Sequence, residues 1–524
     1  MSVVQWPKSS ARRMLDLLRP RRMPAGHRAT RPESDMGALL KIALPSMVAT
    51  IAGTVMSFVD FAFVSRLGSE AQAAVGNGAV LVWTLFALGT GLVSVVSTFA
   101  AQALGQGRPC RGGAYLWQAV YLSIGFALAS LLLMPLVPLV YVALGHPANV
   151  SELETIYTQI LLLSAGPTVA AAAISNYFNG IHRPSVTMVS MIVANLFNAV
   201  ADYALIFGHW GFPAMGVEGA AWATLIALVI RTAWLVAAMA GPKFRREFQP
   251  FAYWRLTARR MQSLVRLGMP VGLQWVADIG AWALFANWLI GRFGTTDLAA
   301  THIAWKLLEL SWMPAIGIGV GINAVVGRAV GQGDHELARR RARLGVMLCV
   351  GYMAVMGTIF ALFRYPLIGL FTEDAAVLDL GANLMLLAAA FQIFDAMSIS
   401  YSSALRGAGD TKWPAIILAG YCYGIVILGG WLLTVMWPEL GSYGPWILCT
   451  IYAIVLSLAL QVRWAHGHWR QIVIFADSHV PPRAAGRNQE SMYGRDGAAR
   501  TDQGDGRRRH GWKPSRQRAG RVAR

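Results

Sequence analysis

The sequence predicts an all-α polytopic membrane protein with about twelve transmembrane helices, arranged as two pseudo-symmetric lobes of six helices each. Three observations predict this fold class: a composition poor in charge, a series of long apolar segments, and motifs that recur at a fixed spacing. Of the 524 residues, 56% are hydrophobic and 14% are charged, whereas soluble proteins have about 25% charged residues. Most of the surface is therefore expected to face lipid.

The apolar segments supply the expected helices in chain order. A helix that crosses the hydrocarbon core of a bilayer needs about 20 mainly apolar residues. Segments of this kind, bounded by charged or turn-forming residues, occur near 37–65, 73–104, 113–143, 153–178, 185–208, 217–241, 263–290, 298–327, 344–371, 376–404, 413–437 and 444–465. The first six are expected to form an N-lobe over 36–242 and the last six a C-lobe over 263–470, joined by a basic cytoplasmic connector over 243–262.

The distribution of positive charge predicts the orientation of these helices. Lysine and arginine gather near the N-terminus and in every second connector, including Arg108 after the second segment and Arg406 after the tenth. The other connectors are poor in both and hold acids such as Glu154 and Asp297. Because positive charge is retained on the cytoplasmic side, both termini are expected in the cytoplasm, and the protein in a bacterial inner (plasma) membrane.

The two terminal stretches, residues 1–35 and 471–524, are basic and lack a long apolar face. Such sequences cannot bury enough apolar surface to fold alone, so both are expected to be disordered cytoplasmic tails. The first is not a cleavable signal peptide, because it has no apolar core of its own. The second is open to two interpretations, contact with anionic lipid or a solvated tail with no specific role.

The two halves repeat short motifs at a nearly constant spacing. Gly68 of Arg-Leu-Gly corresponds to Gly294 of Arg-Phe-Gly, and Gly105–Gly107 to Gly331–Gly333, each pair 226 residues apart. Each motif has the same place in its apolar segment, which indicates a duplication. Because each half has an even number of helices, both enter the membrane from the same side, and the repeat is parallel. The pathway is expected between the lobes, with alternating access by rocking one lobe against the other.

Several function classes are excluded by composition and spacing. The net charge of +19 lies mainly in tails and alternate connectors, as topology predicts, so nucleic-acid binding is not expected. The four cysteines are far apart and form no Cys-x-x-Cys pair, which argues against disulfides, a zinc site or redox chemistry. The ten histidines are scattered, so we expect neither an enzyme nor a cofactor.

Four acidic residues fall inside the apolar segments: Asp60, Asp202, Asp278 and Asp395. An ionised side chain at the centre of a bilayer costs about 3 kcal/mol or more. Each of the four is therefore a candidate functional residue, with a structural hydrogen bond between helices as the alternative.

Asn198 and Asp202 are spaced i, i+4 and share one face of the fifth helix. An amide oxygen and a carboxylate on one face form half of an oxygen cage for Na⁺, and no other metal is expected. The same two groups can equally form a hydrogen-bonded pair that tunes a proton site. Elsewhere, Lys306 and Glu309 are spaced i, i+3 and are expected to neutralise each other.

Five short motifs follow one another in a fixed order. They are Asp60 with Gly68 in the first helix, Ala101–Arg108 after the second, Asn198–Gly208 in the fifth, Gly219–Ala221 at the start of the sixth, and Ala404–Thr411 after the tenth. In this order they resemble the multidrug and toxic compound extrusion (MATE) family over about residues 36–470. The resemblance implies the two-lobe fold and a drug/cation antiport activity. Residue by residue, it also implies that Asp60, Asn198 and Asp202 bind the coupling cation, H⁺ or Na⁺.

The second lobe carries a further resemblance. Gly268–Pro270 followed by Asp278, and Phe391–Ala396 with Asp395, resemble acidic motifs of one branch of that family. The resemblance implies a second coupling site, or a charge site for the substrate, at Asp278 and Asp395.

The expected function is secondary active efflux of organic, cationic or amphipathic compounds by exchange with H⁺ or Na⁺. Its expected partners are small organic substrates and membrane lipid, and the protein is expected to be monomeric. The alternative is a flippase of the same superfamily for lipid or lipid-linked oligosaccharide. A flippase cavity is expected to be more basic, whereas the charge inside these segments is mainly acidic, which favours the exporter.

Overall fold

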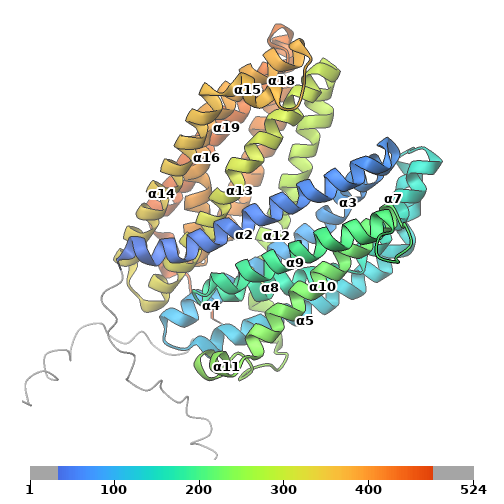
Figure 1. Cartoon of the computed structure of the whole chain (residues 1–524). Coiled ribbons are helices and arrows are strands. Elements are labelled where there is room, and N and C mark those ends of the chain that lie inside the picture. The colour runs from blue at the N-terminus through green and yellow to red at the C-terminus, as the bar shows by residue number, and fades with distance from the viewer. Residues whose placement is uncertain (1–33, 476–524) are drawn as a thin grey trace, which may run out of the picture. The chain divides into compact units, whose positions relative to one another are not determined.

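A computed structural model describes residues 34–475, and every regular element within that range is a helix. The predicted tails at 1–35 and 471–524 lie outside the described residues, apart from 34–35 and 471–475. Figure 1 colours the chain from blue at its N-terminus to red at its C-terminus.

The N-lobe contains the first six membrane spans, which are blue to green in Figure 1. They are α2 (Asp35–Val64), α3 (Ser69–Ser94) with α4 (Val96–Gly105), α5 (Pro109–Leu133) with α6 (Val137–Ala143), α7 (Ala148–Leu162) with α8 (Ala165–Gly180), α9 (Pro184–Phe207) and α10 (Val217–Ala240). The short helix α11 (Pro242–Phe248) begins the connection to the next lobe.

The C-lobe contains the other six spans. They are α12 (Ala258–Ala283) with its continuation to Phe293, α13 (Thr295–Gln332), α14 (His335–Leu362) with α15 (Arg364–Gly369), α16 (Ala375–Ala408), α17 (Lys412–Tyr421) with α18 (Gly430–Met436), and α19 (Tyr443–His466). π-helical segments interrupt two of these spans, at Leu284–Leu289 and Cys422–Gly429.

The predicted fold class is confirmed by the described helices. Ten continuous helical runs are long and apolar enough to cross a membrane, and α7 and α8, which meet at 47°, make an eleventh span together. α12, with its continuation to Phe293, is the twelfth span. These spans divide into two lobes of six, as the repeat predicts.

The repeat is visible in the backbone. Gly68 and Gly294 have φ of 108° and 110° and separate the first two spans of each lobe. The copies of the Gly-Gln-Gly motif lie face to face, because a Cβ on Gly105 would collide with the backbone of Arg328 and one on Gly331 with that of Gln102. The pseudo-symmetry axis therefore passes between these motifs.

The two lobes are joined at the end of the molecule where α4 and α13 end and α5 and α14 begin, here called the arginine-rich end. The Gln102 side chain donates a hydrogen bond to the backbone O of Gly407 at 3.0 Å. Ser97 Oγ donates to Asn323 Oδ1 at 3.2 Å, and these two residues are repeat equivalents. The lobes are thus closed against each other at this end.

The first helix of each lobe also contributes to the core of the other lobe. Leu39 and Ile42 of α2 are buried in the C-lobe core, while Leu264 and Val271 of α12 are buried in the N-lobe core. This exchange packs apolar side chains closely on both sides of the junction, and such packing drives association of helices within a membrane.

The segment after α19 bridges the same junction. Within this C-terminal strap, defined as residues 467–475, Trp469 is fully buried in the C-lobe core. Six residues later, Phe475 packs edge-on against Phe99 and Tyr115 of the N-lobe, with ring centroids 5.8 Å apart in each case. The strap therefore links the two lobes where they already meet.

Candidate functional site

The two acids predicted in the N-lobe lie opposite each other on neighbouring helices. Asp60 lies on α2, about one turn before its end, and Asp202 lies on α9. Asn195 Nδ2 holds α9 along α2 by donating to the backbone O of Ala52 at 2.7 Å. This packing brings the carboxyl groups of Asp60 and Asp202 within hydrogen-bonding range of each other.

Asn198 completes the group from one turn earlier on α9. Its Nδ2 donates to Oδ2 of Asp202 at 2.7 Å, and the two side chains are 4% and 1% exposed. Within residues 34–475, no donor reaches Oδ1 of Asp60 or Oδ1 of Asp202. Buried oxygens without partners are costly, so these two atoms have room for a further ligand besides the hydrogen bond from Asn198.

The charge of the N-lobe group is not balanced by any described lysine or arginine in an ion pair. Two ionised carboxylates at this separation repel strongly in a low-dielectric interior. A shared proton or a bound Na⁺ between Asp60 and Asp202 removes that repulsion, and Asn198 adds an oxygen of the kind that hard cations prefer. Within the described part of the chain, no cluster of three or more His, Cys, Asp or Glu suits a transition metal.

Tyr157 of α7 is a neighbour of this group that sequence analysis missed. Its buried side chain lies close enough to Asp60 and Asp202 for electrostatic interaction. Gly78 of α3 permits this approach, because a Cβ there would be 2.7 Å from the Tyr157 ring. No sequence pattern marks Tyr157, since its position depends on how α7 packs against α3.

In the C-lobe, Asp278 has a different environment. Gln274, one turn earlier on α12, places its Nε2 3.5 Å from Oδ2 of Asp278. Arg406 Nη2 donates to Oε1 of the same glutamine at 2.9 Å. Asp278 is therefore linked through one amide to a positive charge, unlike the acids of the N-lobe.

The position of Arg406 corrects an expectation from the sequence. Its charge suggests a connector after the tenth segment, but α16 continues to Ala408, and Arg406 lies in its last turn. The guanidinium turns inward to Gln274, and its buried Nε has no acceptor among residues 34–475.

Asp395 of α16 is not joined to Asp278 by any hydrogen bond between described residues. Both acids lie within electrostatic range of the buried Tyr452 on α19.

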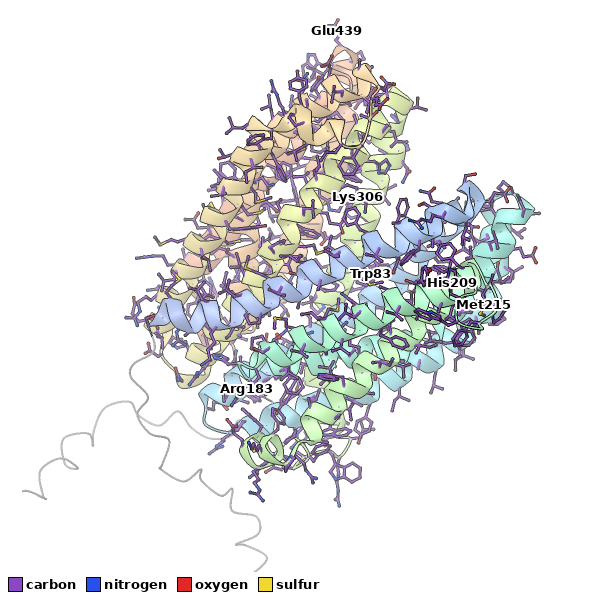
Figure 2. The ribbon with its side chains drawn as sticks, viewed as in Figure 1. Trp83, Arg183, His209, Met215, Lys306 and Glu439 are labelled. Carbon is purple, nitrogen blue, oxygen red and sulfur yellow. The ribbon has the colours of Figure 1, made fainter. Side chains whose placement is uncertain are left out.

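The predicted pairing of Lys306 with Glu309 is present on α13, with Nζ 3.2 Å from Oε2. Lys306 is labelled in Figure 2, and its Nζ also lies 5.4 Å from the ring centre of Phe58 on α2. Because Phe58 belongs to the other lobe, this contact lies where α13 of the C-lobe faces α2 of the N-lobe.

The sequence matches a known protein family and named bacterial relatives. A family model described as MatE matches residues 45–204 and 280–432. A probable multidrug resistance protein NorM of Mesorhizobium japonicum is 30% identical over 464 residues, which covers 84% of this chain and 96% of the relative. The protein of the same name from Rhizobium meliloti is 30% identical over 82% of this chain and 92% of its own length.

Solved structures share the fold. An outward-facing multidrug resistance MATE transporter of the MOP superfamily is 20% identical and has a TM-score of 0.74, with 82% of this chain and 96% of the other covered. A MOP superfamily transporter from Pyrococcus furiosus, whose title reports a binding pocket of reverse polarity, has a TM-score of 0.75 at 21% identity, with 84% and 97% covered.

Proposed function

The chain belongs to the MATE family, whose model matches more than half of it, and from this premise we propose that it exports organic compounds in exchange for H⁺ or Na⁺. The exported compounds are cationic or amphipathic. Curated relatives that align with more than four-fifths of the chain are named probable multidrug resistance proteins, which supports the efflux part of the proposal.

The observation that carries the coupling part is the pair of facing carboxyl groups of Asp60 and Asp202, which form no ion pair with a lysine or arginine of residues 34–475. When H⁺ or Na⁺ binds, the pair has at most one negative charge and is stable. When the ion leaves, two negative charges remain in a buried site, and an organic cation compensates them. Ion and substrate therefore exclude each other, and this competition produces exchange.

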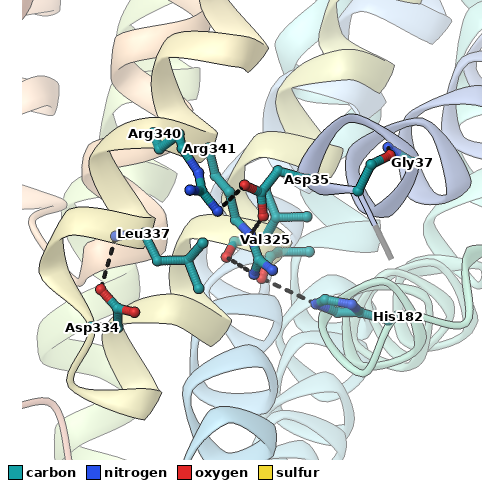
Figure 3. Close-up of polar contacts among 10 residues, drawn as sticks. Asp35, Gly37, His182, Val325, Asp334, Leu337, Arg340 and Arg341 are labelled. Atoms are coloured by element: carbon teal, nitrogen blue, oxygen red, sulfur yellow. Dashed lines mark hydrogen bonds and ion pairs between the residues drawn. The ribbon is translucent and has the colours of Figure 1, made fainter. Parts of the chain in front are cut away.

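The junction of the lobes supports an outward-open arrangement. If positive charge is retained inside, the arginine-rich end faces the cytoplasm. Figure 3 shows the junction there: Asp35 of α2 forms ion pairs with Arg340 and Arg341 of α14, and His182 donates from Nε2 to the backbone O of Ala324 at 3.2 Å. We propose that these contacts close the cytoplasmic end and break when the protein turns inward.

Transport by reconstituted protein tests the proposal. Purified protein in proteoliposomes is given an imposed H⁺ gradient or an imposed Na⁺ gradient, and accumulation of a fluorescent organic cation is followed. We expect one gradient to drive transport by the wild type, and Asp60→Asn and Asp202→Asn to abolish gradient dependence. Asp379→Asn, which changes an exposed acid of α16, is the matched control and should transport like the wild type.

Two outcomes would contradict the proposal. Gradient-driven accumulation that is unchanged in both Asp60→Asn and Asp202→Asn would remove the carboxylate pair from coupling. Failure of either gradient to drive the cation, together with translocation of a labelled lipid-linked oligosaccharide, would favour the flippase instead.

A further inference from the structure

An apolar cavity lies on the outer face of the N-lobe, away from both acidic sites. It has a volume of about 380 Å³ and is lined by residues of α5, α8 and α10 and by Phe251 of the connector. Figure 1 shows α5 and α10 on the side of the N-lobe that is turned away from the C-lobe. Ile124 of α5 and Val236 of α10 line the cavity and are 53% and 42% exposed, so its mouth opens toward lipid.

The side-chain donors that line this cavity are all engaged within the protein. Trp117 Nε1, Ser123 Oγ and Thr232 Oγ1 donate to backbone oxygens at 3.0, 2.7 and 3.0 Å. None of the described residues that line it is acidic. An organic cation would therefore find no counter-charge in the cavity, whereas an alkyl chain needs neither a charge nor a hydrogen bond.

The length of the cavity matches one leaflet of a membrane. Its lining residues on α5 extend from Trp117 to Ala127, which is about 15 Å at 1.5 Å per residue. The hydrocarbon core of a bilayer is about 30 Å thick. Trp117 on α5 and Met239 on α10 are the lining residues nearest the arginine-rich end, where α5 begins and α10 ends. The cavity therefore has the position and length of one acyl chain in the leaflet at that end.

A positive charge lies beside the end of the cavity. Phe251 lines the cavity, and its ring centre is 5.6 Å from that of Trp117. The guanidinium of Arg245, an exposed residue of α11, lies 5.4 Å from the centre of the same Phe251 ring. An apolar cavity with a guanidinium at one end is complementary to a molecule that has an alkyl chain and an anionic headgroup.

Hydrogen bonds fix the connector at this level of the membrane. The Tyr121 hydroxyl donates to the backbone O of Trp254 at 2.8 Å, and Gln118 Nε2 donates to that of Arg255 at 3.1 Å. The Trp254 side chain is 55% exposed, and Arg255 is exposed beside it. Exposed tryptophans next to arginines are typical of the headgroup level of a membrane. The connector therefore holds Arg245 and Arg255 where lipid phosphates lie.

The described residues leave this positive charge uncompensated. Glu247 is the only acid among residues 243–262, and its carboxylate pairs with Arg183 at 3.3 Å. Within residues 34–475, neither Arg245 nor Arg255 forms an ion pair. Both guanidinium groups can therefore bind an anion.

We propose that this cavity binds one anionic phospholipid of the leaflet at the arginine-rich end. One acyl chain lies between α5, α8 and α10, and the phosphate contacts Arg245 and Arg255. The lipid completes the packing among three N-lobe helices and the connector that joins the lobes. The site is separate from the acid pair, so the lipid can bind whether or not the exchange function is correct.

Native mass spectrometry of the purified full-length protein tests the lipid site. The protein is titrated with phosphatidylglycerol, with phosphatidylcholine that has the same acyl chains, and with inorganic phosphate. Ala170→Phe fills the cavity, and its control Ala129→Phe changes an exposed alanine of α5 outside the lining. Arg245→Gln removes the charge beside the cavity, and its control Arg339→Gln changes an exposed arginine at the beginning of α14.

We expect the wild type to bind one phosphatidylglycerol at least about fivefold more tightly than phosphatidylcholine, and inorganic phosphate not to compete. Arg245→Gln should weaken phosphatidylglycerol binding about fivefold and leave phosphatidylcholine binding unchanged. Ala170→Phe should weaken the binding of both lipids, and both controls should bind like the wild type.

Three results would overturn the lipid site. They are equal affinity of the wild type for the two lipids, phosphatidylglycerol binding that is unchanged in Ala170→Phe or in Arg245→Gln, and displacement of the bound lipid by a fluorescent organic cation, which would make the cavity a substrate site. Because Arg245 is exposed, its variant tests the site even where Ala170→Phe does not fold.

Discussion

The two lobes descend from one repeat, yet their acidic sites differ in construction. In the N-lobe, Asp60 and Asp202 face each other from two helices, and no lysine or arginine in the described part of the chain forms an ion pair with them. In the C-lobe, Asp278 is linked through Gln274 to Arg406. At the spacing of 226 residues, the position equivalent to Asp60 is Ala286. The two lobes therefore share a backbone arrangement but differ in their acidic side chains. We expect the N-lobe acids to bind the coupling ion, and we expect Arg406 to balance part of the negative charge of Asp278 in the C-lobe.

The strongest test of this difference replaces the acids of each lobe in turn. Because no ion pair with a described lysine or arginine balances the N-lobe pair, Asp202→Asn should reduce the gradient-driven rate by about a hundredfold, which corresponds to about 3 kcal/mol. Asp278→Asn should reduce it by about tenfold or less, since Arg406 already compensates part of its charge. Initial rates of cation efflux in proteoliposomes measure both, and equal losses in the two lobes would refute the comparison.

Removal of the C-lobe arginine tests the compensation directly. Arg406→Gln removes the charged donor to Gln274 and the positive neighbour of Asp278, and should destabilise the protein by about 1–3 kcal/mol. The double variant Asp278→Asn with Arg406→Gln should regain most of the lost stability. Thermal unfolding in detergent measures these changes in stability, and Lys412→Gln, which changes an exposed lysine, is the control. If the double variant loses as much stability as the two single variants added together, the charges of Asp278 and Arg406 do not interact.

The C-terminal strap tests how firmly the lobes are held together. Phe475 makes two edge-on ring contacts and lies 5.0 Å below the guanidinium of Arg111. Phe475→Leu keeps much of the apolar area but loses these ring interactions, at a cost of about 2 kcal/mol to the closed junction.

The nearby Cys110 is partly exposed, and the other three cysteines are buried, so its alkylation rate reports opening of the junction. We expect that rate to rise in Phe475→Leu and to stay constant in Phe371→Leu, which changes an exposed ring. No change in Phe475→Leu would mean that the strap does not hold the lobes.

The smallest expected effect concerns pH at the arginine-rich end. Burial, and secondly the charge of Arg328, lower the pKa of His182 to about 3, so the ring is neutral when it donates to Ala324. In the unfolded chain its pKa is about 6.5. The unfolded chain therefore binds a proton at His182 more readily than the folded protein does. The contribution of the neutral His182 ring to the free energy of unfolding is fully present above pH 6.5 and is lost progressively as pH falls from 6.5 toward 3.

Between pH 6.5 and 5.5 the loss should be about 1 kcal/mol for this one group. Thermal unfolding of wild type and His182→Asn at these two pH values measures it. The asparagine variant, which does not titrate, should show a loss that is smaller by about that amount. A pH dependence identical in the two proteins would contradict the assignment.

The site was only partly predictable from the sequence. Asp60 and Asp202 were recognisable because a carboxylate within an apolar segment stands out, and Asn198 because its i, i+4 spacing fixes its face. Tyr157 was not recognisable, because it resembles any other aromatic residue in a membrane helix. Glu154 was expected in a connector, where an acid is ordinarily exposed, whereas the structure buries its side chain in the second turn of α7. Arg406 was misplaced because charge at the end of an apolar segment usually belongs to a connector.

The sequence by itself determined the number of membrane helices, their order and the duplication, because hydropathy over about 20 residues and a constant spacing are local properties of the chain. Only the tertiary structure decided which charges meet. Asp60 and Asp202 face each other because α9 packs along α2, and Glu154 becomes buried because Asn77 and His146 cover it. These outcomes depend on how each helix is rotated about its axis, and that rotation is set by packing between segments far apart in the sequence.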